Sequence, residues 1–349
     1  MEGDLCNGRQ IELALKQDSA ELYNFNEVSL LAMLQRLFRH PLVNGMLVIG
    51  MIGLALLCIV KIPDVVLLKR IASHAIQIML LFVAAGLFFL FANQQRLLFI
   101  AFGCAGALCL HFKYVGNISL ALPVKTSEKS ITILHTNTDD FSDDWHSVIN
   151  TIIGTDADVV SFIEVTPNWA QLLLKVLDEY YPHHALITRI DPFGTAIFSR
   201  YPVVHRDTVV YENLPNLSAA IKIDNKKFIK VFSSNSNPPL FRSSFEKLRN
   251  QLDVMAKAIS SSSHPVITAG NYNLDQFSDE LQDFRAEAKL EDSRKTMSPS
   301  INPPTNHLFH TRDLECLRFF NVYDEKSNRL GIMGEYQFKS DDQATAQGG

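Results

Sequence analysis

The sequence is poor in cysteine and has no excess of positive charge. Of its five cysteines, only Cys316 follows residue 112, so the C-terminal part has no internal disulfide and no cysteine-rich zinc site. The formal net charge of −5 argues against a protein that holds a nucleic-acid backbone through bulk positive charge. The composition therefore does not predict a nucleic-acid partner. The sequence also contains no internal repeat that would indicate a repeat protein.

Long apolar runs are confined to the N-terminal part, at residues 42–60, 75–92 and 97–112. Each is close to the roughly 20 residues that cross a bilayer core as a helix, which predicts about three transmembrane helices within residues 41–112. The third run is short and contains Gly103 and Gly106, so a re-entrant helix is an alternative. A cleaved signal peptide is not expected, because the first run begins far from the start and two more follow it.

The flanks of these runs complete the prediction of an integral, multi-pass membrane protein. Residues 1–40 contain leucines at helical spacing, which favour an interfacial amphipathic helix or an extension of the first span. Three spans place the N-terminus and the C-terminal domain on opposite faces. The face that carries the domain has the basic residues Lys61, Lys69, Arg70 and Lys113, which weakly favours a cytoplasmic domain. Residues 113–130 are interpreted as a linker.

Residues 131–339 alternate in the manner of a water-soluble α/β domain. A period-two strand over 131–137 ends in Asn137, and a strand over 157–165 has Glu164 near its end, with an amphipathic helix after each. Further strands are expected at 185–190, 195–199, 203–211, 218–223, 228–233, 265–270, 308–309, 317–322 and 331–338, and further helices at 241–259 and 281–290. Residues 340–349 form a polar tail that we expect to be disordered.

The strand over 265–270 stops at Gly270 and is followed by polar side chains, Asn271 and Asn273. A strand end of this kind is where α/β proteins place their chemistry, because the strand holds a side chain rigidly beside a crevice. Asn271 has no charge, which makes it an unusual residue for catalysis at such a position.

The ordered motifs of residues 131–338 resemble the endonuclease/exonuclease/phosphatase superfamily, whose fold is shared with DNase I, sphingomyelinases and inositol phosphatases. More narrowly they resemble its bacterial membrane-anchored branch, which implies the bacterial inner membrane. The resemblance is carried by Asn137, the segment 157–166, the segment 191–202, a strand before Pro238-Pro239, the segment 269–273, and Asn306-His307. It implies a four-layer α/β sandwich, in which two packed mixed β-sheets are flanked by helices.

The chemistry that the resemblance implies is metal-dependent hydrolysis of a phosphoester. In that chemistry a glutamate holds Mg²⁺, two asparagines orient the phosphate and the nucleophile, and an aspartate polarises the attacking water. Asn137, Glu164 and Asn273 match the family pattern. The remaining positions depart from it, because Asn271 stands for the water-activating aspartate, Asn235 for a histidine, and Asn306 for the aspartate of an aspartate–histidine pair with His307. The final Ser-Asp-His motif is missing, and the chain there reads Asn328-Arg329-Leu330.

Three hypotheses follow from this pattern. The first is a membrane-anchored domain that has lost hydrolysis and acts as a binding or scaffold module, with protein partners and no required cofactor. The second is a divergent Mg²⁺-dependent phosphodiesterase, phosphatase or nuclease, in which Glu164 and the acidic cluster Asp139, Asp140, Asp143 and Asp144 hold the metal. The cluster is equally explained as a solvated helix start. The third is a membrane subunit of an envelope assembly that uses the domain as a docking platform.

Overall fold

The computed structural model describes residues 37–38, 40–61, 65–116, 123–126, 129–141, 145–294, 297 and 300–339, with Asp140 described by its backbone alone. These residues fall in two compact units, one within 1–60 and 74–110 and the other within 61–73 and 111–349. Most of the N-terminal region 1–40, in which the sequence favours an amphipathic helix, and the tail 340–349 lie outside the described residues.

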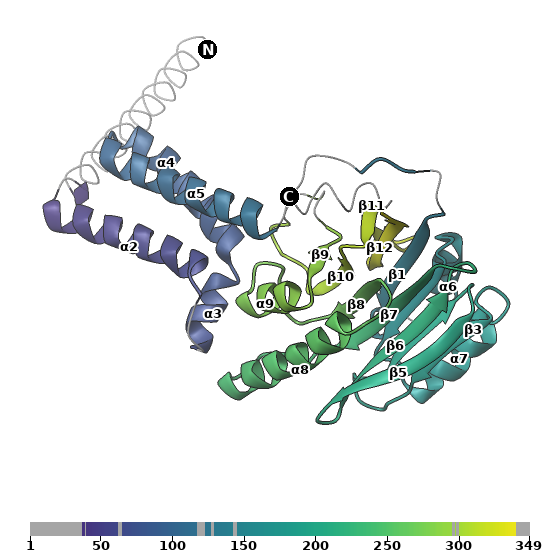
Figure 1. The fold of residues 1–349 in the computed structure, drawn as a ribbon. Coiled ribbons are helices and arrows are strands. Elements are labelled where there is room, and N and C mark those ends of the chain that lie inside the picture. The colour runs from purple at the N-terminus through teal and green to yellow at the C-terminus, as the bar shows by residue number, and fades with distance from the viewer. Residues whose placement is uncertain are drawn as a thin grey trace, which may run out of the picture. The chain divides into compact units, whose positions relative to one another are not determined.

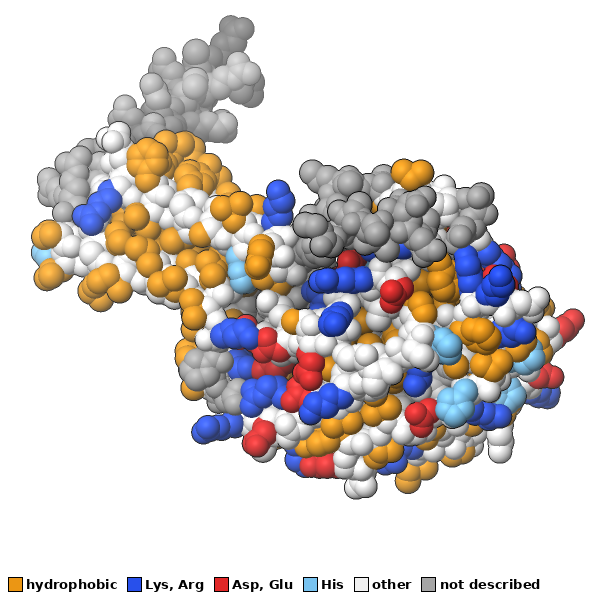
Figure 2. Space-filling model, in the orientation of Figure 1, with side chains coloured by type: hydrophobic (Ala, Val, Ile, Leu, Met, Phe, Trp, Pro, Cys, Tyr) orange, Lys and Arg blue, Asp and Glu red, His pale blue; other side chains and the backbone are white. Residues whose placement is uncertain are grey.

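The first unit consists of apolar helices, namely α2 (Pro41–Ile59), α4 (Ala75–Phe91) and most of α5 (Gln95–Val115). Their bounds agree with the three predicted spans to within three residues, and Figure 2 shows mainly hydrophobic side chains over them. Among the described residues, α2 and α5 are each long and apolar enough to cross a membrane, and α3 (Val66–Ala72) with α4 makes a third candidate if that bent pair is one span. The third predicted run is a continuous helix of 21 residues despite its glycines.

The second unit has the α/β architecture that the sequence predicts. Its helices after α3 are η1 (Thr138–Asp140), α6 (Trp145–Gly154), α7 (Pro167–Leu177), α8 (Arg242–Ser260) and α9 (Asp279–Glu287). Its strands are β1 (Ile131–Asn137), β2 (Val159–Ile163), β3 (His183–Ile187), β4 (Thr195–Ser199), β5 (Val203–Tyr211), β6 (Leu214–Lys222), β7 (Phe228–Asn235), β8 (Val266–Asn271), β9 (Leu290–Asp292), β10 (Asn306–Thr311), β11 (Leu314–Tyr323) and β12 (Arg329–Phe338).

These strands form two mixed sheets (Figure 1). The first has the order β11-β12-β1-β2-β4-β3 and the second has the order β5-β6-β7-β8-β10-β9. In each sheet one central pair is parallel, β1 with β2 and β7 with β8, while the other pairings are antiparallel. Both parallel pairs are joined by an amphipathic helix, α6 and α8 respectively, as a parallel connection requires.

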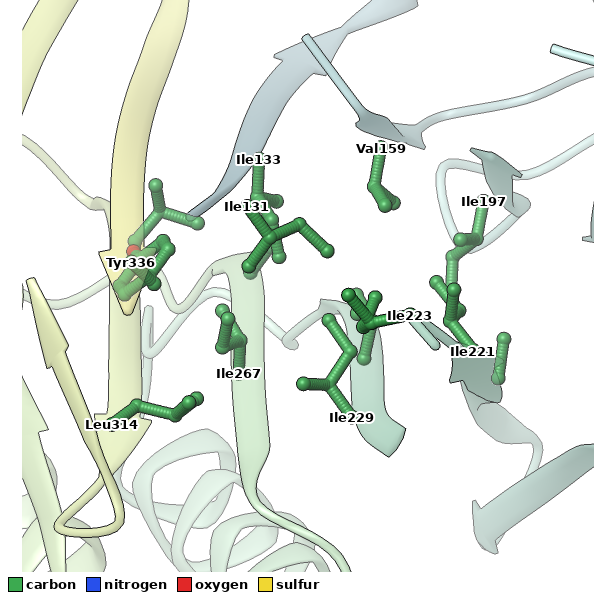
Figure 3. Close-up of a cluster of buried hydrophobic side chains, with 14 of the residues drawn as sticks. Ile131, Ile133, Val159, Ile197, Ile221, Ile223, Ile229, Ile267, Leu314 and Tyr336 are labelled. Carbon is green, nitrogen blue, oxygen red and sulfur yellow. The ribbon is translucent and has the colours of Figure 1, made fainter. Parts of the chain in front are cut away.

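The main core lies between the two sheets and is built largely of isoleucine (Figure 3). Ile131 and Ile133 project from β1 of the first sheet, and Ile221 and Ile267 project from β6 and β8 of the second. Two further clusters lie on the outer faces, where α6 and α7 cover the first sheet and α8 and α9 cover the second. The result is the predicted four-layer order of helix, sheet, sheet and helix.

The structure differs from the sequence prediction in the linker and in some short elements. Residues 113–115 of the predicted linker continue α5. Residues 123–126 of the linker are bound to β12, where the Thr126 amide donates to Gln337 Oε1 at 2.9 Å. The sequence did not predict the short helix α3 or the three-residue strand β9, because each has too few residues to show a periodic apolar pattern.

Glu335 of β12 is a buried carboxylate that fastens the segment before β1 to the first sheet. Burial by itself would raise its pKa, but hydrogen bonds from Lys125, Ser130 and Arg318 prevail and lower the pKa from 4.5 to about 2. The three donors lie 2.7–2.8 Å from the carboxylate oxygens. Because the pKa is lower in the folded state, this carboxylate stabilises the fold fully above about pH 4.5, and its contribution is lost as the pH falls through about 2.

We therefore expect Glu335→Gln to lower the free energy of unfolding by about 2 kcal/mol at pH 7, because charge-assisted hydrogen bonds are lost. The difference from wild type should shrink steadily between about pH 4.5 and pH 2. Urea unfolding followed by tryptophan fluorescence measures this, since both tryptophans, Trp145 and Trp169, lie in the domain. Glu325→Gln, in the exposed turn before β12, is the control, and equal effects of the two changes would contradict the assignment.

Candidate functional site

Three asparagines lie side by side at one end of the second sheet. Asn235, the last residue of β7, pairs in register with Asn271 of β8, which in turn pairs with Asn306 of β10. Side chains alternate between the faces of a strand, so Asn271 shares the face of Ala269, and Asn306 shares the face of Leu308. Ala269 and Leu308 belong to the core between the sheets. The three amides therefore form a row, the amide row, at the mouth of the space between the two sheets.

The first sheet contributes Asn137 and Glu164. Parallel pairing of β1 with β2 places Asn137 opposite Ile163, directly before Glu164. The Asn137 amide donates from Nδ2 to Glu164 Oε1 at 2.9 Å, and Thr138 Oγ1 donates to the Glu164 carbonyl at 2.8 Å. Glu164 has a φ of 63°, a left-handed conformation that an ordinary side chain seldom adopts. Such strained backbone is common at functional sites.

A loop between β3 and β4 links the two halves of the site. The Val165 amide donates to the Gly194 carbonyl at 3.0 Å, and a Cβ at position 194 would lie 2.1 Å from the Val165 carbonyl oxygen. Only glycine permits this approach. On the other side, Asn235 donates from Nδ2 to the Pro192 carbonyl at 2.8 Å. Val165, which follows Glu164, and Asn235 of the second sheet are thus tied to one loop.

The side chains of Asn271 and Asn273 form hydrogen bonds with backbone groups at the ends of β7 and β8. Asn271 Oδ1 accepts the backbone N–H of Asn273 at 3.0 Å, and Asn273 donates from Nδ2 to the Ser236 carbonyl at 2.7 Å. Ser236 in turn donates its backbone N–H to the Asn271 carbonyl at 2.9 Å. Asn273 also has a left-handed φ of 53°, which asparagine tolerates well. These contacts lock the ends of β7 and β8 together.

His307 is not part of the amide row. It follows Asn306 along β10, so its side chain points to the opposite face, where its ring stacks on Phe309 with centroids 5.2 Å apart. Its Nε2 donates to the Leu274 carbonyl at 2.9 Å, and its Nδ1 faces the Arg294 guanidinium at 3.1 Å. Burial, and then the charge of Arg294, hold the pKa of His307 well below its usual range. A neutral, fully bonded histidine packs the helix side of the sheet.

His135 of β1 is a buried histidine that sequence reasoning passed over. It shares the inner face with Ile133, and its Nδ1 contacts Ser161 Oγ at 3.1 Å, while Ser161 donates to Ser233 Oγ of the second sheet at 2.9 Å. Burial lowers the pKa of His135 to about 3. His135 is therefore neutral, and it contacts Ser161, the residue whose hydroxyl joins the first sheet to Ser233 of the second. Its place two residues before Asn137 in the strand was the available sequence signal.

Two arginines stand near the same edge. Arg294 is buried and donates from Nη2 to the Asn306 carbonyl at 2.8 Å, and burial lowers its pKa to about 10. Arg329 begins β12, next to the end of β1, since Thr136 donates to the Leu330 carbonyl at 2.7 Å. The positive charge of Arg329 contributes to lowering the pKa of His135. Arg329 lies in the segment where the family's Ser-Asp-His motif is missing, and the missing motif marked this segment in the sequence.

A family model described as the Endonuclease/Exonuclease/phosphatase family matches residues 136–328, which is more than half of the chain. The chain belongs to this family. The match spans every residue placed at the site except His135 and Arg329, and it agrees with the fold class predicted from the ordered motifs. A search of curated proteins finds no match.

Solved structures of the family share the fold at low sequence identity. An endonuclease/exonuclease/phosphatase from Bacteroides vulgatus is 15% identical with a TM-score of 0.51, and the match covers 61% of this chain and 100% of that chain. D. rerio TDP2 complexed with a single-strand DNA product is 15% identical with a TM-score of 0.50, over 60% of this chain and 100% of that one. The human Nocturnin catalytic domain with bound sulfate is 11% identical with a TM-score of 0.50, over 60% and 95%.

The family implies a divalent metal. Among the positions matched to the family pattern in the sequence, Glu164 is the one carboxylate, while Asn235, Asn271 and Asn306 offer neutral amides, which is a donor set poor in the negative charge that a divalent metal prefers. The described residues contain no group of three His, Cys, Asp or Glu that could hold a metal ion. Of the acidic cluster, the Asp139 side chain is exposed, while Asp143, Asp144 and the side chain of Asp140 lie outside the described part of the chain.

Proposed function

We propose that this domain is a binding module of the family that retains the site architecture and has lost hydrolysis. The observation that carries the proposal is the amide row, in which Asn235, Asn271 and Asn306 occupy three adjacent strand ends in register. An amide neither accepts a proton from water at neutral pH nor supplies a metal with negative charge. The frame that would present a substrate is therefore kept, and the groups that would activate water are not.

The charge around the site supports an anionic ligand group, such as a phosphate ester. Arg329, which is exposed at the start of β12, and the buried Arg294, which binds the Asn306 carbonyl, place two positive charges at this end of the sandwich. Guanidinium groups recognise phosphate through paired N–H donors. The sulfate bound to the Nocturnin domain shows that this fold accommodates an oxyanion in that protein. The chain's net charge of −5 still argues against extended nucleic acid as the ligand. A protein partner that carries such a group remains compatible with the scaffold role.

The proposed anchor is the apolar N-terminal unit, which supports an integral membrane protein. The proposed bacterial inner membrane comes from the family resemblance, and the proposed cytoplasmic side of the domain comes from the basic residues that flank the helices on that side. The two helices α2 and α5, with α3 and α4 as a further candidate, support two or three crossings. Exposed apolar side chains on these helices, including Met46, Ile49 and Phe91, are suited to contact with lipid.

The competing function is a divergent phosphodiesterase that uses Glu164 as its metal ligand. One observation favours it, namely the intact hydrogen bond of 2.9 Å between Asn137 and Glu164, which keeps the carboxylate oriented at the strand end. The two functions differ in whether Glu164 supports turnover.

A hydrolysis assay separates them. We expect the full-length protein in detergent, with Mg²⁺ or Mn²⁺, to hydrolyse a 4-nitrophenyl phosphodiester at least about 10⁴-fold more slowly than an active family member, because removal of a general base alone typically costs 10²- to 10⁴-fold. The residual rate should be the same in wild type and in Glu164→Ala. Turnover that Glu164→Ala abolishes, while Glu179→Ala in the exposed turn after α7 leaves it intact, would establish the competing function.

A further inference from the structure

The short helix α3 belongs to the domain although it lies between two apolar helices in the chain. Residues 61–73 join the second compact unit, whereas α2 before them and α4 after them belong to the first. Val66 packs against the cluster formed by α8 and α9, which includes Phe245 and Phe284. The loop that connects the first two predicted spans is thus part of the outer helical layer of the domain.

A buried ion pair holds α3 on this layer. Lys69 of α3 pairs with Glu280 of α9, and their side chains are 10% and 4% exposed. Lys69 Nζ also lies 4.8 Å from the ring centre of Phe245 on α8. A second pair from the same loop, Lys61 with Asp283, has an N–O distance of 2.5 Å but is 67% and 61% exposed. Loss of one partner from a buried pair is far more costly than loss of an exposed pair.

The end of α5 contacts the same element. The ring of Phe112 lies 4.6 Å from the ring of Phe277, just before α9. Arg285 of α9 donates from Nη1 to the Val115 carbonyl, at a longer distance of 3.4 Å. The loop that contains α3 and the last turn of α5 therefore both contact α9 or the residues just before it.

From α9 the packing leads directly to the site. Phe284 packs on Tyr272 with ring centroids 5.6 Å apart, and Tyr272 is fully buried between Asn271 and Asn273 in the chain. The start of α9 is tied to the turn before it, because Gln282 donates from Nε2 to the Phe277 carbonyl at 2.7 Å. A displacement of α9 would thus bear on Tyr272, and through it on the neighbouring asparagines.

We propose that α9 couples the membrane-proximal segments, the α3 loop and the last turn of α5, to the amide row. Figure 2 shows basic and acidic side chains intermixed over α3, α8 and α9, the three helices that this coupling involves. The buried Lys69–Glu280 pair is its central contact, so a change in the position of α3 alters the order of residues 271–278. The coupling does not depend on whether the site hydrolyses or only binds.

Hydrogen exchange of the full-length protein in lipid nanodiscs tests this. Lys69→Ala leaves Glu280 buried without its nearest cation, and we expect exchange of backbone amides over 271–287 to rise at least about tenfold. Peptides from β2, which α3 does not contact, should be unchanged. Lys61→Ala is the matched control in the same loop, because its ion pair is exposed, and its effect should stay under about twofold.

A second variant separates coupling from general damage. Lys69→Met with Glu280→Leu removes both buried charges and keeps apolar contacts, so exchange over 271–278 should return to within about threefold of wild type. Faster exchange confined to α3 and α9, with 271–278 unaffected in Lys69→Ala, would overturn the proposal. So would equal effects of Lys61→Ala and Lys69→Ala, or faster exchange of β2 together with 271–278.

Discussion

The double variant Asn235→His, Asn271→Asp is expected to bind Mn²⁺ at least about tenfold more tightly than the wild-type protein, because it returns an anionic oxygen ligand to the site. Aspartate has the shape of asparagine, so its carboxylate can keep accepting the Asn273 N–H that Asn271 Oδ1 accepts at 3.0 Å. A histidine at position 235 can supply an N–H to the Pro192 carbonyl in place of the amide that now lies 2.8 Å away. Both changes therefore preserve the contacts that hold the strand ends.

Titration calorimetry with Mn²⁺ on the full-length protein in detergent measures this affinity. Asn225→Asp adds the same charge in the exposed turn between β6 and β7 and is the matched control, expected to leave the affinity unchanged. Arg329→Ser in the double-variant background should tighten binding further, since it removes a positive charge from the site edge. If the double variant binds Mn²⁺ no better than Asn225→Asp, then the site cannot accept a metal even when a carboxylate is restored.

Gly270→Ala is expected to destabilise the domain by about 3 kcal/mol, because the new methyl group has no room. A Cβ at position 270 would lie 2.4 Å from the carbonyl oxygen of Ser234 on the neighbouring strand β7. That atom is backbone, so β7 and β8 would have to separate, and their register holds Asn235 beside Asn271. The glycine that ends the apolar run is therefore required by the close approach of two parallel strands.

Urea unfolding followed by tryptophan fluorescence measures the loss in Gly270→Ala. Gly154→Ala is the control, since a Cβ at the end of α6 meets no heavy atom within 4 Å. Alanine is also the better helix former, so that change should be neutral or stabilise by up to about 1 kcal/mol. Equal unfolding midpoints for the two variants would show that β7 and β8 separate at little cost.

The fold could be predicted largely from local patterns. The period-two strand of 131–137 and the helical spacing of Phe245, Leu248 and Leu252 each reflect one buried face, and a buried face leaves its period in the sequence whatever lies opposite. The apolar runs predicted the N-terminal helices, and the bounds of α2, α4 and α5 match those runs closely. The ordered motifs then indicated the family, because their spacing reflects the sequence of strands and turns.

The make-up of the site could be predicted only where a residue stands in a motif. Asn137, Glu164, Asn235, Asn271 and Asn306 were candidates by their places at strand ends, and the structure brings them to one end of the sandwich. His307 was a candidate by adjacency alone, and the alternation of β10 turns it to the other face. The sequence marked the segments around His135 and Arg329, but the contacts of His135, Arg294 and Arg329 join segments that are separate in the chain, which no local pattern records.

The sequence by itself determined that the three side chains of the amide row carry no charge, since an asparagine is an amide whatever its surroundings. It also determined the elements, because each carries its own burial pattern. Only the tertiary structure decided that three asparagines from three strands form one row, that Arg294 backs it, and that α3 joins the domain through Lys69 and Glu280. These are contacts between residues far apart in the chain, and their geometry is set by sheet register and helix packing.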